Sequence, residues 1–180
     1  FFSCNEHPKD VANKLDIPYY VLSHDNEEIL DIVNKHSIDL GIIAGARILR
    51  YKIIQFFNRG IINFHPGLLP ECRGLDSMFW SIYNNYPLGV TSHLINEKID
   101  CGKLILKTKI KLSSNDNLFS INKKIYNLQL ALIKPTLKKI QDNLELIDLD
   151  DSIANNSYMS ELLQKEVIKK TINYIKNFSN

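Results

Sequence analysis

Asn63, His65 and Asp100 are three polar side chains whose types and spacing could do chemistry together. Asn63 and His65 are one residue apart at the end of a predicted strand, so both side chains should face the same side. Asp100 comes 100 − 65 = 35 positions after His65, in the loop after the next predicted strand. If these strands are neighbours in the sheet, their carboxyl-end loops should bring Asp100 beside His65.

Acyl transfer to an amine needs groups of these kinds. An amide or imidazolium N–H can stabilise the oxyanion of a tetrahedral intermediate, and losing one such donor typically costs about 100- to 1,000-fold in rate. A carboxylate beside His65 would orient the ring and favour its charged form, and could accept the proton of the attacking amine. Because no serine or cysteine lies in a recognisable nucleophile elbow, direct attack is favoured. On residue types alone, a structural role for His65 is the commoner alternative.

The elements that must position these groups alternate between strand and helix, which indicates an α/β fold with a mostly parallel twisted sheet and helices on both faces. The 180 residues, 44% hydrophobic and 23% charged, suit one compact α/β domain. Pro135 is expected to kink or end the helix that starts near Asn115. The predicted strands are Phe1–Cys4, Asp39–Ala44, Ile61–Phe64, Gly89–Ile95 and Lys103–Ile110, and the predicted helices are Pro8–Leu15, 25–36, Tyr51–Asn58, Ser77–Asn84, 115–135 and Ser160–Phe178.

Composition argues against several classes of protein. No apolar run approaches the ~20 residues that span a bilayer, and no secretory signal is present, so a cytoplasmic protein is expected. The net charge of +2 favours neither nucleic acid nor a membrane surface as partner. Cys4, Cys72 and Cys101 offer neither a disulfide framework nor a zinc pattern.

Two separated segments carry a family resemblance. Ile61–Gly74 (IINFHPGLLPECRG) contains two prolines and two glycines, and Gly89–Gly102 (GVTSHLINEKIDCG) ends in Asp-x-Gly. Both resemble the signatures of the folate-dependent formyltransferases, the family of glycinamide ribonucleotide transformylase, methionyl-tRNA formyltransferase and the sugar N-formyltransferases. The resemblance covers about Ile17 to Lys109. It implies a Rossmann-like fold, 10-formyltetrahydrofolate as co-substrate without a metal, and Asn63, His65 and Asp100 as catalytic residues.

The resemblance also implies the residues around the catalytic trio. AGARIL, at 44–49, matches the stretch that contacts the pterin ring, and a cis bond is expected before Pro70. Gly67 stands where many members have Ser, which removes one possible hydrogen bond. The implied cofactor-binding residues are Ala46, Arg47, Ile48, Leu49, Ile99 and Gly102, and the implied substrate-binding residues are Pro66, Gly67, Arg73, Trp80 and His93.

The resemblance divides the chain into a catalytic domain at 1–142 and a C-terminal helical extension at 143–180 packed on the same domain. Members of the family begin with a strand and a glycine-containing loop ahead of the segment that Phe1–Cys4 matches. The domain is therefore expected to be incomplete at its N-terminus and to lack the first strand of the family. The resemblance also implies a homodimer that forms through the C-terminal helices.

Several acceptors and two other classes of protein remain open. Trp80, seven residues after Arg73, is typical of the sugar enzymes, so a nucleotide-linked amino sugar is the first choice. Glycinamide ribonucleotide is the second choice, and tRNA the last because the chain has no basic stripe. His93 could support the site or simply pack. His65, His93 and Asp100 could instead form a two-His-one-carboxylate metal site, and an inactive binding module is a third alternative.

Overall fold

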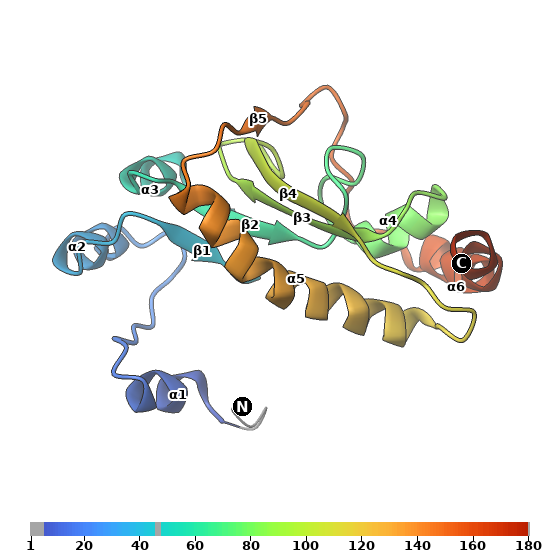
Figure 1. The fold of residues 1–180 in the computed structure, drawn as a ribbon, viewed down its shortest axis with the longest axis horizontal. Helices are drawn as coiled ribbons and strands as arrows, with labels where there is room; N and C mark the ends of the chain where they lie inside the picture. The colour runs from blue at the N-terminus through green and yellow to red at the C-terminus, as the bar shows by residue number, and fades with distance from the viewer. Residues whose placement is uncertain (1–5, 46–47, 180) are drawn as a thin grey trace.

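The computed structural model describes residues 6–45 and 48–179, in which five strands form one open sheet in the order β1-β2-β3-β4-β5 (Figure 1). The expectations for Phe1–Cys4, Ala46 and Arg47 fall outside these residues. The α/β architecture agrees with the expected Rossmann-like fold. The strands are β1 (Gly41–Ile43), β2 (Ile61–His65), β3 (Gly89–Leu94), β4 (Lys103–Lys109) and β5 (Ile147–Asp148).

Strand direction departs from the mostly parallel sheet expected from the sequence. β1 and β2 are parallel, whereas the pairs β2–β3, β3–β4 and β4–β5 are antiparallel. A parallel pair needs a crossover of about a dozen residues or more, and residues 95–102 between β3 and β4 are too few. Between β2 and β3 the chain forms α4 (Ser77–Tyr83) beyond one end of the sheet and returns from that same end (Figure 1).

The helix α5 (Leu118–Gln141) runs along one face of the sheet and packs against β3 and β4 (Figure 1). Asn117 and Ser120 form a reciprocal capping box at its start. The helix does not end at Pro135, one of the two expected outcomes, because it continues for six residues beyond it. Buried Leu132, Thr136 and Ile140 on both sides of Pro135 hold the helix on the sheet, so tertiary packing outweighs the lost backbone hydrogen bond.

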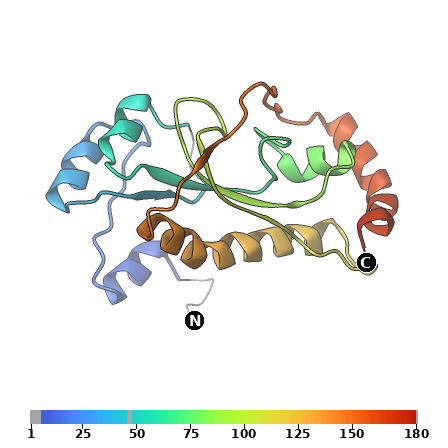
Figure 2. The ribbon, with the colours of Figure 1, turned by 45° about the horizontal axis from the view of Figure 1, so that its top comes forward.

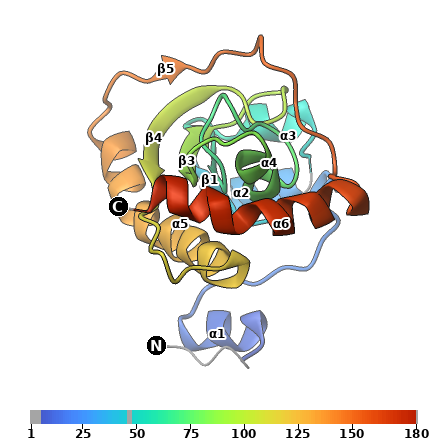
Figure 3. The ribbon, with the colours of Figure 1, turned by 90° about the vertical axis from the view of Figure 1, so that its right-hand side faces the viewer.

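The last helix, α6 (Glu161–Phe178), packs against α4 and lies across one end of the sheet (Figure 3). Val167, Tyr174 and Ile175 of α6 belong to the main hydrophobic core, together with Ile62 of β2 and Ile105 of β4. The C-terminal helix is therefore part of the same core as the sheet.

The remaining helices lie toward the β1 end of the sheet. Here α2 (Glu28–Lys35) packs against α3 (Tyr51–Phe56). The first helix, α1 (Pro8–Lys14), has no buried residue and lies apart from the sheet (Figure 2). No helix in the described ranges is long and apolar enough to cross a membrane.

An irregular segment, residues 149–159, connects β5 to α6 and is called the strap below (Figure 1). Its backbone is held at both ends: Leu149 N–H donates to the Gly102 carbonyl at 2.8 Å, and Met159 N–H donates to Asp76 Oδ2 at 2.8 Å. Between these points Asn156 forms a parallel bridge with Gly74. The strap is thereby fixed against the loop that follows β2.

Candidate active site

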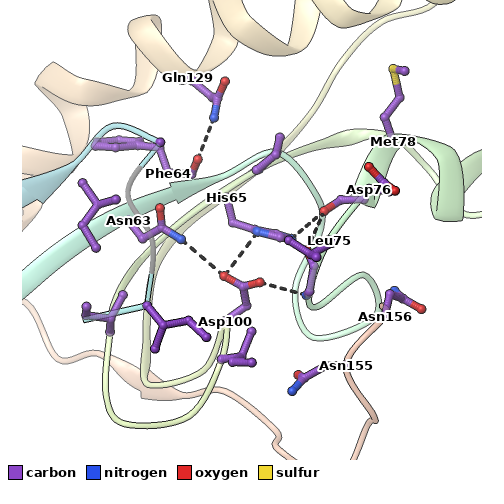
Figure 4. Close-up of a pocket in the computed structure, with 18 of the residues that line it drawn as sticks. Asn63, Phe64, His65, Leu75, Asp76, Met78, Asp100, Gln129, Asn155 and Asn156 are labelled. Carbon is purple, nitrogen blue, oxygen red and sulfur yellow. Dashed lines mark hydrogen bonds and ion pairs between the residues drawn. The ribbon is translucent and has the colours of Figure 1, made fainter. Parts of the chain in front are cut away.

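A pocket of about 810 Å³ opens between the carboxyl end of β1 and β2, the loop at 95–100, the start of α4 and the strap. Figure 4 shows Asn63, His65 and Asp100 converging on its floor, with Asn155 and Asn156 of the strap beyond Asp100. Three segments that are far apart in sequence therefore contribute side chains to one cavity.

The strand β2 places two of the three side chains. Asn63 and His65 alternate with Phe64 along β2, so they share one face, and both line the pocket. The pairing of β1 with β2 ends at Ile43 and Asn63, so Phe64 lies beyond it. The Phe64 carbonyl instead accepts a 2.7 Å hydrogen bond from Gln129 Nε2 of α5. This bond anchors the strand between the two polar residues.

Asp100 reaches the same place by a different route from the one expected. Because β2 and β3 are antiparallel, the carboxyl end of β3 lies beside the amino end of β2, with Leu94 opposite Ile62. The loop 95–102 returns across the sheet face, and Asp100 takes a left-handed backbone conformation with φ 43°. Its Oδ1 lies 3.3 Å from Asn63 Nδ2 and 3.4 Å from His65 Nδ1. The expected proximity is confirmed, but the reason given for it was wrong.

Both ring nitrogens of His65 face acceptors. Nε2–H donates to the Cys72 carbonyl at 2.6 Å, since a carbonyl can only accept, and Nδ1 faces Asp100 Oδ1. Ser77 Oγ also lies 3.0 Å from Nε2 and itself donates to the Gly74 carbonyl. The loop after β2 therefore holds Nε2, and Nδ1 is the ring nitrogen that faces Asp100.

His93 fixes the amide of Asn63. The two residues are directly opposite each other on β2 and β3, and an extra residue in β4 interrupts the ladder beside His93. Nδ1–H of His93 donates to the Cys101 carbonyl at 2.8 Å, which leaves Nε2 to accept from Asn63 Nδ2 at 3.3 Å. His93 is fully buried, and this burial lowers its pKa below the usual 6.5 despite the nearby Asp100. The ring is therefore neutral at pH 7.

The carboxyl group of Asp100 is ionised in this setting. Burial alone would raise its pKa, but the hydrogen bond and charge interaction with His65 and the 2.8 Å hydrogen bond from Gly74 N–H lower the pKa below the usual 3.8. Asp100 consequently offers a charged acceptor at neutral pH, held on one oxygen by a backbone amide and facing His65 and Asn63 with the other.

The proline loop after β2 is pinned by Thr91. Thr91 Oγ1 donates to the Gly67 carbonyl at 2.8 Å and accepts from Leu69 N–H at 3.0 Å. The Leu69–Pro70 peptide bond is cis, as expected from the sequence. Gly67 packs so closely that an added Cβ would lie 2.9 Å from His65 Nε2 and 2.9 Å from Ser77 Cβ.

The residues expected to bind the cofactor separate into two groups. Ile48, Leu49 and Ile99 line the pocket and give it an apolar wall. Gly102 does not line the pocket. Its φ is 98°, and an added Cβ would lie 2.1 Å from the Leu94 carbonyl oxygen, so a glycine is needed for the tight turn into β4. Ala46 and Arg47 lie outside the described residues.

Of the residues expected to bind substrate, only Pro66 lines the pocket. Gly67 and His93 lie behind His65 and Asn63 respectively. Trp80 directs its indole N–H to the Ser157 carbonyl at 2.9 Å, and Arg73 donates to backbone carbonyls of the 95–100 loop and the strap. These four residues support the walls of the pocket from behind.

Sequence reasoning missed the polar side chains on two other walls. Asn122 and Gln129 project from α5, and Asn155, Asn156 and Ser157 come from the strap. The run Asn155-Asn156-Ser157 was a signal of a turn between two apolar segments, but nothing in its spacing placed it beside a loop 80 residues earlier.

The rival metal site can be compared with this geometry. Within the described part of the chain, no group of three His, Cys, Asp or Glu side chains is arranged to hold a metal ion. Both nitrogens of His93 already face the Cys101 carbonyl and the Asn63 amide, and His93 Nε2 is 4.0 Å from Asp100 Oδ1.

The chain is similar to known proteins in sequence and in fold. A family model described as "Formyl transferase" matches residues 4–136. Methionyl-tRNA formyltransferase of Clostridioides difficile is 32% identical over 137 residues, covering 74% of this chain and 44% of that protein. The chain spans about half the length of the curated relatives it matches.

Solved structures show the same fold. Phosphoribosylglycinamide formyltransferase from Anaplasma phagocytophilum matches with a TM-score of 0.70 and 24% identity, covering 85% of this chain and 79% of that one. A sugar N-formyltransferase from Shewanella matches with a TM-score of 0.66 and 20% identity, covering 93% and 72%. With a family model that matches well over half of its residues, the chain belongs to the formyl transferase family.

Proposed function

We propose that the protein transfers a formyl group from 10-formyltetrahydrofolate to the amino group of a nucleotide-linked amino sugar. The observation that carries the proposal is the convergence of Asn63, His65 and Asp100 on one pocket floor, with Asp100 Oδ1 within 3.4 Å of both partners. This arrangement offers hydrogen-bond donors for a developing oxyanion beside an ionised acceptor for a proton.

The donor supplies an activated formyl carbon, and the amine forms the new C–N bond there as the bond to the folate nitrogen breaks. His65, whose Nδ1 makes only a long 3.4 Å contact with Asp100 Oδ1, exchanges this contact for a hydrogen bond to the formyl oxygen as negative charge develops on it. Asn63 adds a second donor, because its amide contacts at 3.3 Å are long and easily exchanged for a better acceptor. Asp100, directly or through a water, accepts the proton that the amine loses, and the folate nitrogen takes up a proton as it leaves, so that the products are the formamide and tetrahydrofolate.

The two sides of the pocket suit two different ligands. Ile48, Leu49 and Ile99 form an apolar wall suited to a flat pterin ring, while Asn155 and Asn156 present carboxamides with no hydrogen-bond partner among the described residues. Carboxamides on the strap would bind sugar hydroxyls, since they can both donate and accept. The catalytic domain would then extend over 1–142, with 143–180 completing the acceptor side.

Charge constrains where the phosphates of any of these acceptors can lie. None of the described lining residues is Lys or Arg, whereas Asp76, Glu97 and Asp100 are acidic. A phosphate of glycinamide ribonucleotide, of a nucleotide-linked sugar or of a tRNA would find no cationic partner among them, so only the uncharged sugar part of the acceptor suits this lining. Methionyl-tRNA is the second candidate, because relatives 30–32% identical carry the name methionyl-tRNA formyltransferase.

The test is a transfer assay that follows tetrahydrofolate release with three acceptors: nucleotide-linked amino sugars, glycinamide ribonucleotide and methionyl-tRNA. We expect turnover with an amino sugar, lowered by orders of magnitude in Asp100→Asn with the fold retained. Turnover on tRNA or glycinamide ribonucleotide alone would contradict the proposed acceptor but would still support the proposed formyl-transfer reaction. Turnover that Asp100→Asn leaves untouched would contradict the assignment of the site.

A further inference from the structure

The side chain of Arg73 is a buried cation whose described hydrogen bonds all go to backbone carbonyls. It is 4% exposed, and no carboxylate lies within ion-pair distance of it among the described residues. Its Nε and Nη2 donate to the Ile99 carbonyl at 3.1 and 2.8 Å. Its Nη1 donates to the Asp151 and Ile153 carbonyls of the strap at 3.1 and 2.8 Å. One guanidinium therefore joins the 95–100 loop to the strap through four hydrogen bonds.

Each of these bonds ends beside a pocket wall. Ile99 directly precedes Asp100, and only Ala154 separates Ile153, the last strap residue that Arg73 binds, from Asn155. The backbone of the same dipeptide adds to the junction: Gly74 N–H donates to Asp100 Oδ2, and the Arg73 carbonyl accepts from Asn156 N–H at 2.8 Å. Residues 73 and 74 thus contact the 95–100 loop and the strap at once.

We propose that Arg73 is a positioning residue, which holds Asp100 against His65 and locks the strap to the Asp100 loop. The effect of Arg73 on kcat rests on the proposed function, whereas its role in holding the strap to the Asp100 loop does not. A left-handed residue such as Asp100 needs its surroundings to hold it. The planar fork of a guanidinium can satisfy the carbonyl before Asp100 with two parallel N–H groups and still reach the strap.

Direct substrate binding by Arg73 fits the contacts less well. Its guanidinium does not line the pocket, and four of its five N–H groups already donate to carbonyls. A ligand would have to displace the strap in order to reach it. Arg73 therefore acts on the reaction through Asp100.

A double-mutant cycle separates positioning from a general loss of stability. Arg73→Met should lower kcat about 100-fold, the cost typical of a catalytic group displaced by about 1 Å. In an Asp100→Asn background the same change should lower the residual kcat by less than about threefold, because the group that Arg73 positions is already gone. An equal loss of kcat in both backgrounds would overturn the proposal.

Amide hydrogen exchange tests the structural part without any activity. Arg73→Met should lose protection together in residues 96–102 and 149–156, whereas Arg59→Met should not. Arg59 is a matched control, since its Nη2 also donates to a backbone carbonyl, that of Ile140, at 2.9 Å but away from the pocket. Unchanged protection in either segment would overturn the inference even if no acceptor is found.

Arg73→Lys keeps the test informative if Arg73→Met does not fold. An ammonium keeps the charge but lacks the planar fork, so it should restore only part of the protection and of kcat. Full restoration by Lys would show that charge alone suffices and would overturn the role assigned to the fork.

Discussion

His93 Nε2 lies 3.3 Å from Asn63 Nδ2, across the antiparallel pair of β2 and β3. The other ring nitrogen of His93, Nδ1, donates to the Cys101 carbonyl. A neutral, fully buried histidine thus sets the orientation of the amide on the pocket floor. His93 does not line the pocket itself. Its contribution to activity should therefore pass through Asn63.

Removing this acceptor should misorient the amide without removing it. His93→Leu leaves one Asn63 N–H without its buried partner, a loss of about 1.4 kcal/mol, so kcat should fall about tenfold. His93→Gln keeps an acceptor at this position and should retain most of the activity. The KM for the folate should change little in both variants. Steady-state kinetics that show equal loss with Leu and Gln would contradict this role.

The sequence predicted the polar residues of the floor better than the route that brings them together. Asn63 and His65 followed from period-two alternation at a strand end, which depends only on local geometry. The position of Asp100 depends on the antiparallel direction of β3 and on a loop that folds back, and no local pattern records either. The strap was missed for the same reason, since its partners, Arg73 and Gly74, lie 80 residues earlier.

The two perturbed groups of the site should act in separate pH windows. The folded state keeps His93 neutral, so the unfolded chain binds the extra proton, and stability should fall as pH drops below about 6.5. The pKa of Asp100 is lowered on folding, so its contribution is present above about 3.8 and is lost only as pH falls further.

Urea unfolding at a series of pH values can separate these windows. His93→Gln should flatten the decline that starts near pH 6.5, by at most about 1.4 kcal/mol per pH unit, and leave the acid window intact. Asp100→Asn should do the reverse. If His93→Gln leaves the slope between pH 6.5 and 5 unchanged, the neutral state assigned to His93 is wrong.

Gly74 should be intolerant of any side chain. Its φ is 92°, and an added Cβ would lie 2.2 Å from the Asn156 carbonyl oxygen, so Gly74→Ala must displace the strap as well as strain the backbone. Gly60→Ala is the control, because its φ of 85° is similar but its nearest neighbour is the flexible Leu94 side chain at 3.2 Å. Thermal or urea unfolding should show a loss of about 1 kcal/mol for Gly60→Ala and about 3 kcal/mol or more for Gly74→Ala. Equal losses of stability in the two variants would mean that the strap can move away from residue 74 at little energetic cost.

Asn155 should affect the acceptor and not the donor. It lines the pocket from the strap, so Asn155→Ala should raise the KM for the acceptor about tenfold, the effect of one lost hydrogen bond, and leave the KM for the folate unchanged. Ser152→Ala, on the exposed part of the strap, is the matched control. A higher folate KM in Asn155→Ala would place the donor, and not the acceptor, against the strap.

Gly67 should be needed for the position of His65. A Cβ at residue 67 would lie 2.9 Å from both His65 Nε2 and Ser77 Cβ, closer than ordinary van der Waals contact allows. Gly67→Ala should therefore push the ring away from Asp100 and lower kcat about 100-fold, with a loss of stability of about 1–3 kcal/mol. The same argument applies to Gly67→Ser, although the family resemblance places Ser at this position in many members. Ser77 occupies the space here, and its hydroxyl lies 3.0 Å from the same ring nitrogen.

A second change can test whether Ser77 and a side chain at residue 67 compete for one space. Ser77→Gly removes one of the two 2.9 Å contacts, so kcat should be higher in the Gly67→Ser, Ser77→Gly double variant than in Gly67→Ser alone. The Ser77→Gly single variant, measured beside it, accounts for the loss of the original hydroxyl. Additive losses in this cycle would show that the two positions do not exchange roles, and that Gly67 is required for the shape of the proline loop alone.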